Sequence, residues 1–222
     1  MVFHFGRKFG ESIHGEYLEV RLPDTSPIGV YYKVYTPELW SGVDTGKTVV
    51  LLFDNSMNTK TWEQVGTPEV LKQNRYRAIV VYLPQLHQNA AANGPLYPLK
   101  GAILLEIMEK LKLQNSVLVS PSKTGTSALP VVLRSGLPIK AFIAIVPSDT
   151  DQFTNKEYRI LQTKTLILYG SNDHETGTLA TLETLKQLPN SMVIEMGHAG
   201  HFCYVDRTIQ FHSLLLKYLE GL

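Results

Sequence analysis

The chain contains 222 residues, of which 44% are hydrophobic and 18% are charged, and its formal net charge is +1. These values are typical of a folded globular protein, and the small charge argues against nucleic acid or an acidic membrane surface as a partner. Cys203 is the only cysteine, which excludes an internal disulfide. The N-terminus lacks the apolar core of a signal peptide, and no stretch is apolar enough for a membrane helix. We therefore expect a cytoplasmic protein that could also reside in the nucleus.

Two strands with alternating polar and apolar residues come first. They cover residues 15–22 and 29–36, and the turn-forming sequence PDTSP between them predicts an antiparallel hairpin over about 15–36. From about residue 45 the pattern changes to continuous apolar strands that alternate with helical segments, which is typical of a parallel sheet covered on both faces. The predicted strands are residues 48–54, 77–84, 115–120, 140–146, 164–170 and 191–196. The predicted helices are residues 61–74, 101–113, 126–135, 178–188 and 209–222, and Gly66 and Pro68 could split the first of them.

The order of these elements predicts an α/β protein. We expect a single domain over residues 1–222 with the α/β-hydrolase fold, in which a mostly parallel sheet of about eight strands has helices on both faces. The catalytic core would cover about 45–222, and the chain is too short for a large lid domain. The polar, helix-poor stretch 84–98 is a candidate loop over the site, because long loops in compact domains are often functional.

Ser122 is the candidate nucleophile. It lies in the sequence VLVSPSKTG (117–125), where a strand ends in a small-residue turn and a helix begins. The nucleophile elbow of an α/β-hydrolase requires small residues two positions before and after the serine, and here Ser120 and Thr124 replace the usual glycines. A serine before a helix can also be an ordinary N-cap. Ser120 is the competing candidate for the nucleophile. Because it lies at the end of the strand, we expect its side chain to point into the fold, where it would support the turn, rather than into the cleft.

An acid and a base follow the serine in the order that an α/β-hydrolase uses. Asp173 comes directly after the apolar run 164–170, and His201 lies in the glycine-flanked sequence GHAGH after the last strand. His198 and His201 together give only a weak zinc signal, so no metal is expected. The alternative acids are Asp149 and Asp151, and the alternative bases are His174 and His198.

Two other segments look like phosphate-binding loops. Residues 44–48 end like a P-loop but lack its first glycine and precede a strand, whereas residues 120–127 follow a strand but lack the Gly-Lys-Ser/Thr order. Nucleotide binding is therefore the less favoured interpretation. Lys123 could attract an anionic acyl group, although a solvated lysine at a helix start is the simpler interpretation. Cys203 is interpreted as a small packed residue.

The sequence resembles the α/β-hydrolase domain-containing protein 14 family over about residues 45–222. The resemblance is carried by VSPSKTGTSALP (119–130), KTLILYGSND (164–173), LKQLPNSMVIEMGHAGHFCY (185–204) and FHSLLLKYLEGL (211–222), with further matches at Thr61-Trp62, 76–84 and 146–153. It implies Ser122 as nucleophile, Asp173 as acid and His201 as base, in a small cytosolic or nuclear hydrolase that acts on acyl groups. Members of the family are linked to ester hydrolysis and to coenzyme-A-dependent removal of acetyl groups from protein lysines.

The chain departs from the family at the oxyanion loop. The family's His-Gly pair after the third strand is replaced by Phe53-Asp54, and its glycine-rich turn after the fourth strand by residues 85–88. The oxyanion donors would then be the backbone N–H groups of Asn55 and Lys123. A carboxylate at Asp54 would oppose the developing negative charge by ~1 kcal/mol or more.

These patterns predict a serine hydrolase or acyltransferase that acts on a small acyl ester, a thioester or an acetyl-lysine-type amide, in a small molecule or an acylated protein. The alternative is a catalytically weak or inactive hydrolase-fold protein that serves as a binding or structural subunit, because of Phe53-Asp54. No cofactor is expected, and coenzyme A as an acyl acceptor follows from the resemblance alone. The edge of the N-terminal hairpin could pair with a protein partner.

Overall fold

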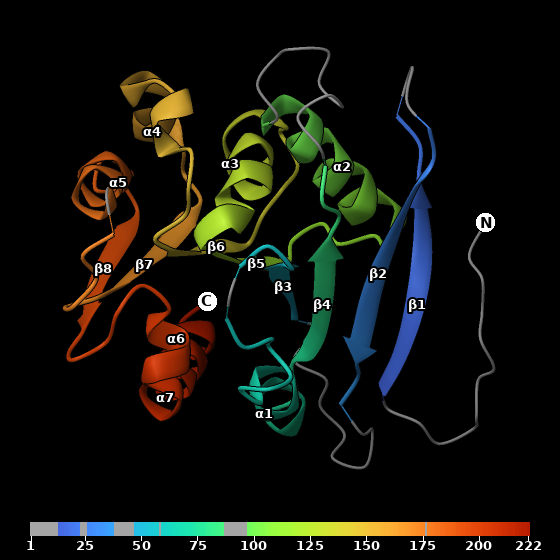
Figure 1. Ribbon diagram of the computed structural model, residues 1–222, viewed down its shortest axis with the longest axis horizontal. Helices are drawn as coiled ribbons and strands as arrows, with labels where there is room; N and C mark the ends of the chain where they lie inside the picture. The colour runs from blue at the N-terminus through green and yellow to red at the C-terminus, as the bar shows by residue number, and fades with distance from the viewer. Residues whose placement is uncertain (1–12, 23–25, 38–46, 58, 87–96, 176) are drawn as a thin grey trace.

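A β-sheet forms the centre of the computed structural model, which describes residues 13–22, 26–37, 47–57, 59–86, 97–175 and 177–222 (Figure 1). Within these residues the sheet has eight strands in the order β1-β2-β4-β3-β5-β6-β7-β8. β2 is antiparallel to both β1 and β4, and the other neighbouring strands are parallel. The predicted mostly parallel sheet with an antiparallel entry hairpin is therefore confirmed. The strands are β1 (Ile13–Val20), β2 (Ile28–Tyr35), β3 (Thr48–Asp54), β4 (Arg77–Leu83), β5 (Val117–Pro121), β6 (Ala141–Ile145), β7 (Lys164–Gly170) and β8 (Ser191–Met196).

Helices cover both faces of the sheet (Figure 1). In β3 the alternate residues Val50 and Leu52 join the core beneath α2 and α3, whereas Val49 and Leu51 join the core beneath α1 and α7. This double burial explains why the parallel strands are continuous apolar runs in the sequence. The helices are α1 (Thr67–Gln73), α2 (Tyr97–Lys110), α3 (Gly125–Arg134), α4 (Asn155–Ile160), α5 (Thr178–Leu185), α6 (Cys203–Asp206) and α7 (Thr208–Glu220).

Local differences from the predicted helices have physical causes. The helix predicted over 61–74 begins only at Thr67, because Gly66 has a φ of 77° that interrupts the helical backbone. Pro130 lies inside α3. Its ring packs against Gly101 of α2, where an added Cβ would come within 2.4 Å of the proline Cβ. The short helices α4 and α6 were not predicted, because so few residues show no clear periodicity.

The carboxyl ends of the parallel strands lie at one edge of the sheet, which is where ligands bind in open α/β folds. Ser122 follows β5, Asp173 follows β7 and His201 follows β8, so this edge gathers all three candidate residues. Residues 87–96 of the predicted loop over the site lie outside the described residues. None of the helices in the described part of the chain is long and apolar enough to cross a membrane.

Candidate active site

Ser122 stands at a sharp turn between β5 and α3. Its φ is 44°, in the left-handed region that a non-glycine residue seldom adopts. A 3-10 turn over Ser122–Thr124 follows at once and leads into α3. A strained residue between a parallel strand and a helix is the backbone geometry of a nucleophile elbow.

The two residues that replace the usual glycines of the elbow bond to each other. Ser120 Oγ and Thr124 Oγ1 are 2.8 Å apart, and the Thr124 hydroxyl donates to the Pro121 carbonyl at 2.8 Å. Because the single Thr124 proton goes to Pro121, Ser120 is the donor between the two hydroxyls. Both side chains are fully buried. Ser120 therefore supports the turn, as expected from the sequence.

Gly125 allows the start of α3 to lie against the loop after β6. A Cβ at this position would come within 2.6 Å of both Pro147 Cβ and the Ser148 carbonyl oxygen. The Ser148 N–H donates to the Ser122 carbonyl at 2.9 Å. Gly125 lies one position later than the glycine of the usual elbow pattern. By leaving room for Pro147 and Ser148, it allows the backbone of Ser122 to bond to the loop after β6.

Ser122, His201 and Asp173 form a continuous chain of hydrogen bonds. His201 Nε2 lies 2.8 Å from Ser122 Oγ, and His201 Nδ1 lies 2.9 Å from Asp173 Oδ2. Because an ionised carboxylate can only accept, Nδ1 carries the imidazole proton, and Nε2 is the acceptor for the Ser122 hydroxyl. The Asp173 side chain is fully buried, whereas His201 keeps 12% of its side chain exposed. The structure thus brings together the three residues selected from the sequence.

The loops after β7 and β8 are pressed against each other. The Asn172 N–H donates to the Ala199 carbonyl at 2.8 Å. A Cβ on Gly170 would lie 2.2 Å from that same carbonyl oxygen. Only glycine therefore permits the close approach that places His201 beside Asp173.

The alternative acids and bases occupy other positions. Asp149 and Asp151 line the wall of the cleft beside Ser122, and His174 and His198 are exposed. Within the described residues, the carboxylate that accepts a hydrogen bond from His201 is that of Asp173.

Glu175 is a neighbour of the site that the sequence patterns did not reveal. Its Oε2 lies 3.5 Å from His201 Nε2, and 61% of its side chain is exposed. Its backbone N–H donates to Asp173 Oδ1 at 3.0 Å. Its position two residues after the acid was the only available signal, and an exposed loop glutamate is too common to select on that basis.

The turn after β3 carries the predicted oxyanion donor Asn55. Asp54 Oδ1 accepts the Ser56 N–H at 2.7 Å, and the Asp54 carbonyl accepts the Met57 N–H at 2.9 Å. The N–H groups of Ser56 and Met57 are therefore bonded within the turn itself.

Two lysines contact this turn. Lys100 Nζ, from the first turn of α2, lies 4.0 Å from Asp54 Oδ2, and the Asp54 side chain is only 5% exposed. Lys123 Nζ donates to the Ser56 carbonyl at 3.1 Å. Phe53, at the position of the family's histidine, is buried in the core and packs edge-on against Tyr82. The sequence shows only the negative charge of Asp54 at this turn, whereas the fold places a compensating ammonium beside it.

A cleft of about 400 Å³ opens beside Ser122 and His201. The loop after β6, Glu175 and the start of α5 form its walls. Within that loop Val146 has a φ of 43°, which is a strained conformation for a β-branched residue. Strain of this kind persists only where the surrounding structure holds the backbone, so the wall of the cleft is a fixed surface.

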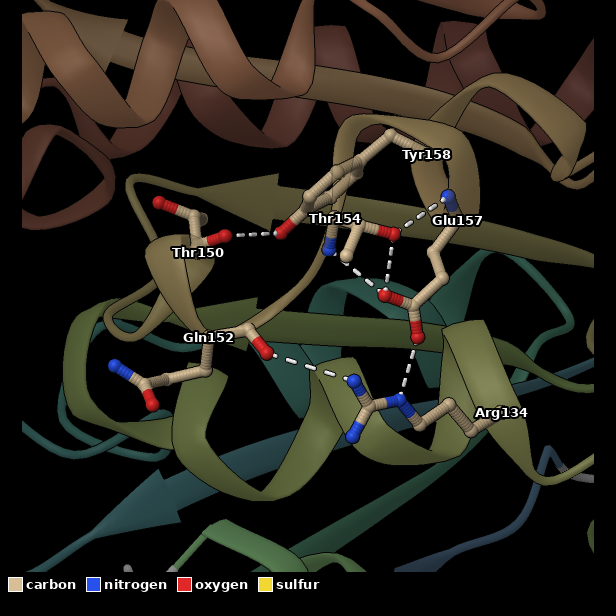
Figure 2. Close-up of polar contacts among 6 residues, drawn as sticks. All are labelled: Arg134, Thr150, Gln152, Thr154, Glu157 and Tyr158. Carbon is tan, nitrogen blue, oxygen red and sulfur yellow. Dashed lines mark hydrogen bonds and ion pairs between the residues drawn. The ribbon is translucent and has the colours of Figure 1, made fainter.

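Polar contacts behind this wall hold it in place (Figure 2). Thr154 and Glu157 form a capping box at the start of α4, and Arg134 Nε donates to Glu157 Oε1 at 2.6 Å. The Tyr158 hydroxyl donates to the Thr150 carbonyl, a cleft residue, at 2.8 Å. The hydrogen bond from Arg134, with help from Thr154, lowers the pKa of Glu157 to about 2.

Cys203 is buried and is not a candidate nucleophile. Burial raises the pKa of the Cys203 thiol to about 12, so the thiol stays protonated and unreactive near neutral pH. Within the part of the chain that the structure describes, no group of three or more His, Cys, Asp or Glu side chains is arranged to hold a metal ion.

The sheet, with a serine at a strained strand-to-helix turn, defines an α/β-hydrolase. Solved structures agree: a CIB-like hydrolase from Thermoplasma acidophilum has a TM-score of 0.76 at 15% identity and covers 95% of this chain and 100% of its own. Rv0554 from Mycobacterium tuberculosis has a TM-score of 0.73 at 14% identity and covers 93% and 99%. Similarity at such low identity shows the fold alone. No protein-family model matches the chain.

Sequence relatives give the family. ABHD14A from Rattus norvegicus is 40% identical over 178 residues, which cover 78% of this chain and 72% of the relative. The human protein named "Putative protein-lysine deacylase ABHD14B" is 36% identical over 178 residues, covering 79% and 84%. The chain therefore belongs to the α/β-hydrolase domain-containing protein 14 family. Human ABHD14A is longer: at 39% identity, the match spans 78% of this chain but only 64% of that protein.

Proposed function

We propose that this chain is a serine hydrolase or acyltransferase in which Ser122 attacks a small acyl ester, a thioester or an acetyl-lysine-type amide. The observation that carries the proposal is the hydrogen-bonded chain from Ser122 Oγ through His201 to the buried Asp173 carboxylate. In this arrangement His201 takes the serine proton as Ser122 attacks, and Asp173 stabilises the imidazolium that forms. His201 then gives the proton to the leaving group, and Ser122 holds the acyl group as an ester.

The second half-reaction returns the enzyme to its starting state. Water, activated by His201, attacks the acyl-serine and releases the acid. The resemblance suggests coenzyme A as an alternative acceptor, but the carboxylates of Asp149, Asp151 and Glu175 outnumber the one lysine of the cleft, Lys123, and so disfavour its phosphate groups. We therefore assign water as the acceptor and derive no step through coenzyme A.

The substrate class is an acyl group small enough for the cleft. A space of about 400 Å³ beside Ser122 suits a short acyl chain together with part of its leaving group. The printed name of the human relative, "Putative protein-lysine deacylase ABHD14B", supports an acylated lysine side chain as one such substrate. An acylated protein would then be the partner, in the cytoplasm or nucleus.

A fluorophosphonate probe tests the proposal, because it reacts with an activated serine and marks the residue that carries it. We expect labelling of the wild-type protein, none of Ser122→Ala, and retained labelling of Ser120→Ala. Equal labelling of Ser122→Ala would contradict the assignment of the nucleophile. An unlabelled wild-type protein would instead favour the alternative function as a binding or structural subunit, which the replacement of His-Gly by Phe53-Asp54 motivates.

A further inference from the structure

We propose that Lys100 and Asp54 are positioning residues that hold the oxyanion turn, the segment Asp54–Met57, and that this ion pair takes over the role of the family's His-Gly. The inference rests on the proposed function, because the turn matters only if Ser122 creates an oxyanion. Neither residue needs to touch the substrate. Their effect passes through the backbone N–H of Asn55.

The carboxylate of Asp54 shapes the turn. By accepting the Ser56 N–H at 2.7 Å, it closes a side-chain turn of the kind that aspartate favours at such positions. The Met57 N–H is bonded to the Asp54 carbonyl, so the N–H groups of both Ser56 and Met57 are bonded within the turn. The shape of the turn sets the position of the Asn55 N–H, which is the donor assigned to the developing negative charge.

The charge of that carboxylate requires a partner. Asp54 is 5% exposed, and a buried, uncompensated carboxylate is strongly unfavourable. It also belongs to the turn that would stabilise the oxyanion, where a net negative charge would raise the barrier. Lys100 Nζ lies 4.0 Å from Oδ2, with 18% of its side chain exposed, so it can neutralise the carboxylate and leave the shape of the turn unchanged.

Lys123 connects the same turn to the nucleophile. Its Nζ donates to the Ser56 carbonyl at 3.1 Å, and its own backbone N–H is the second proposed oxyanion donor. The turn is therefore fixed at two points, by Lys100 from α2 and by Lys123 from the residue after Ser122. This double attachment sets the separation of the two donors, which is the quantity that a functional oxyanion hole requires.

Turnover of an activated acetyl ester by three variants tests the inference. Lys100→Met should lower kcat at least ~10-fold with KM changed less than ~3-fold, because the transition state and not the bound substrate carries the negative charge. Asp54→Asn should lower kcat less than Lys100→Met does, since the asparagine oxygen still accepts the Ser56 N–H and no carboxylate is left unpaired. The double variant Lys100→Met/Asp54→Asn should recover most of the lost kcat, because no charge is left unpaired.

Lys110→Met is the matched control, because Lys110 lies on the same helix in an ion pair with Glu106. We expect it to retain wild-type kcat. If Lys100→Met keeps kcat within twofold of wild type, the inference is wrong. It is also wrong if the double variant is as slow as Lys100→Met, because the defect would then not come from the unpaired charge.

Hydrogen exchange of the turn gives a readout that does not need activity. The amides of Ser56 and Met57, which are bonded within the turn, should exchange at least ~10-fold faster in Lys100→Met than in wild type, with recovery in the double variant. Unchanged exchange in Lys100→Met would overturn the inference even if turnover fell. A wild-type protein that neither labels with the probe nor turns over the ester refutes the proposed function, while the exchange rates still decide whether the pair holds the turn.

Discussion

The acid–base side of the site and its oxyanion side are built in different ways. Asp173 and His201 are placed by backbone contacts between two neighbouring loops, which meet because Gly170 leaves room for the Ala199 carbonyl. The oxyanion turn is held by side-chain charges from Lys100 and Lys123, which come from other elements. The placement of Asp173 and His201 depends on close packing of the two loops and not on the balance of charges between side chains. The oxyanion turn depends on charge balance and can be altered by a single lysine.

The acid–base side should fail completely when its hydrogen-bond pattern is changed. Asp173→Asn retains the shape of the side chain but no longer requires the proton on His201 Nδ1. We expect kcat to fall by about 10⁴-fold, with little change in the free energy of unfolding. Steady-state kinetics and chemical denaturation measure the two quantities. Glu175→Gln, which alters the exposed neighbouring carboxylate, should change kcat only a few-fold; equal losses in both variants would mean that the wrong carboxylate has been assigned.

The packing between the two loops can be tested at Gly170. Gly170→Ala would bring a methyl group within 2.2 Å of the Ala199 carbonyl oxygen, so the loop that carries His201 must move. We expect a loss of about 3 kcal/mol in the free energy of unfolding, together with loss of probe labelling. Gly197→Ala is the control in the same loop, because a Cβ there meets open space. Similar stability of the two variants would contradict the packing argument.

Substitution of Thr124, which supports the elbow, should have an intermediate effect on the free energy of unfolding. Thr124→Val removes the hydroxyl that bonds both Ser120 and Pro121, and leaves the buried Ser120 hydroxyl without its acceptor. We expect a loss of about 1–2 kcal/mol in the free energy of unfolding, measured by denaturant titration. Thr124→Ser keeps the hydroxyl and should lose less. If the valine variant is as stable as wild type, the hydroxyl pair does not stabilise the turn.

Substitution of Glu157, which lies behind the wall of the cleft, should have the smallest effect on the free energy of unfolding, and this effect should depend on pH. The pKa of Glu157 falls from its ordinary value of 4.5 to about 2 in the folded protein, so its stabilising effect is full above pH 4.5 and is lost as the pH falls toward 2. Glu157→Gln should therefore reduce the free energy of unfolding by at most about 1 kcal/mol at pH 7, because solvent screens the pair, and by less at about pH 3. Glu183→Gln, in an exposed pair with Lys186, should have almost no effect at either pH. A difference that grows on acidification would contradict the assignment.

The fold was predictable because each parallel strand buries both faces. The runs 48–54, 140–146 and 164–170 are apolar except at their ends, and the structure contains strands at all three places. The short helices α4 and α6 could not be predicted, because their positions follow from capping and loop packing rather than from periodicity. The helix over 61–74 was predicted too long because the left-handed backbone at Gly66 is a tertiary choice that the sequence only permits.

The sequence by itself indicated the positions of Ser122, Asp173 and His201, because each lies in the segment that follows a strand and parallel strands end at one edge of a sheet. It also determined that the oxyanion loop differs from the family's, through Phe53-Asp54. Only the tertiary structure decided that Asp54 is compensated, because Lys100 reaches it from a helix distant in the chain. The positions of the strands along the chain are encoded locally by the hydrophobic pattern, whereas the pairing of two charges depends on where separate elements pack.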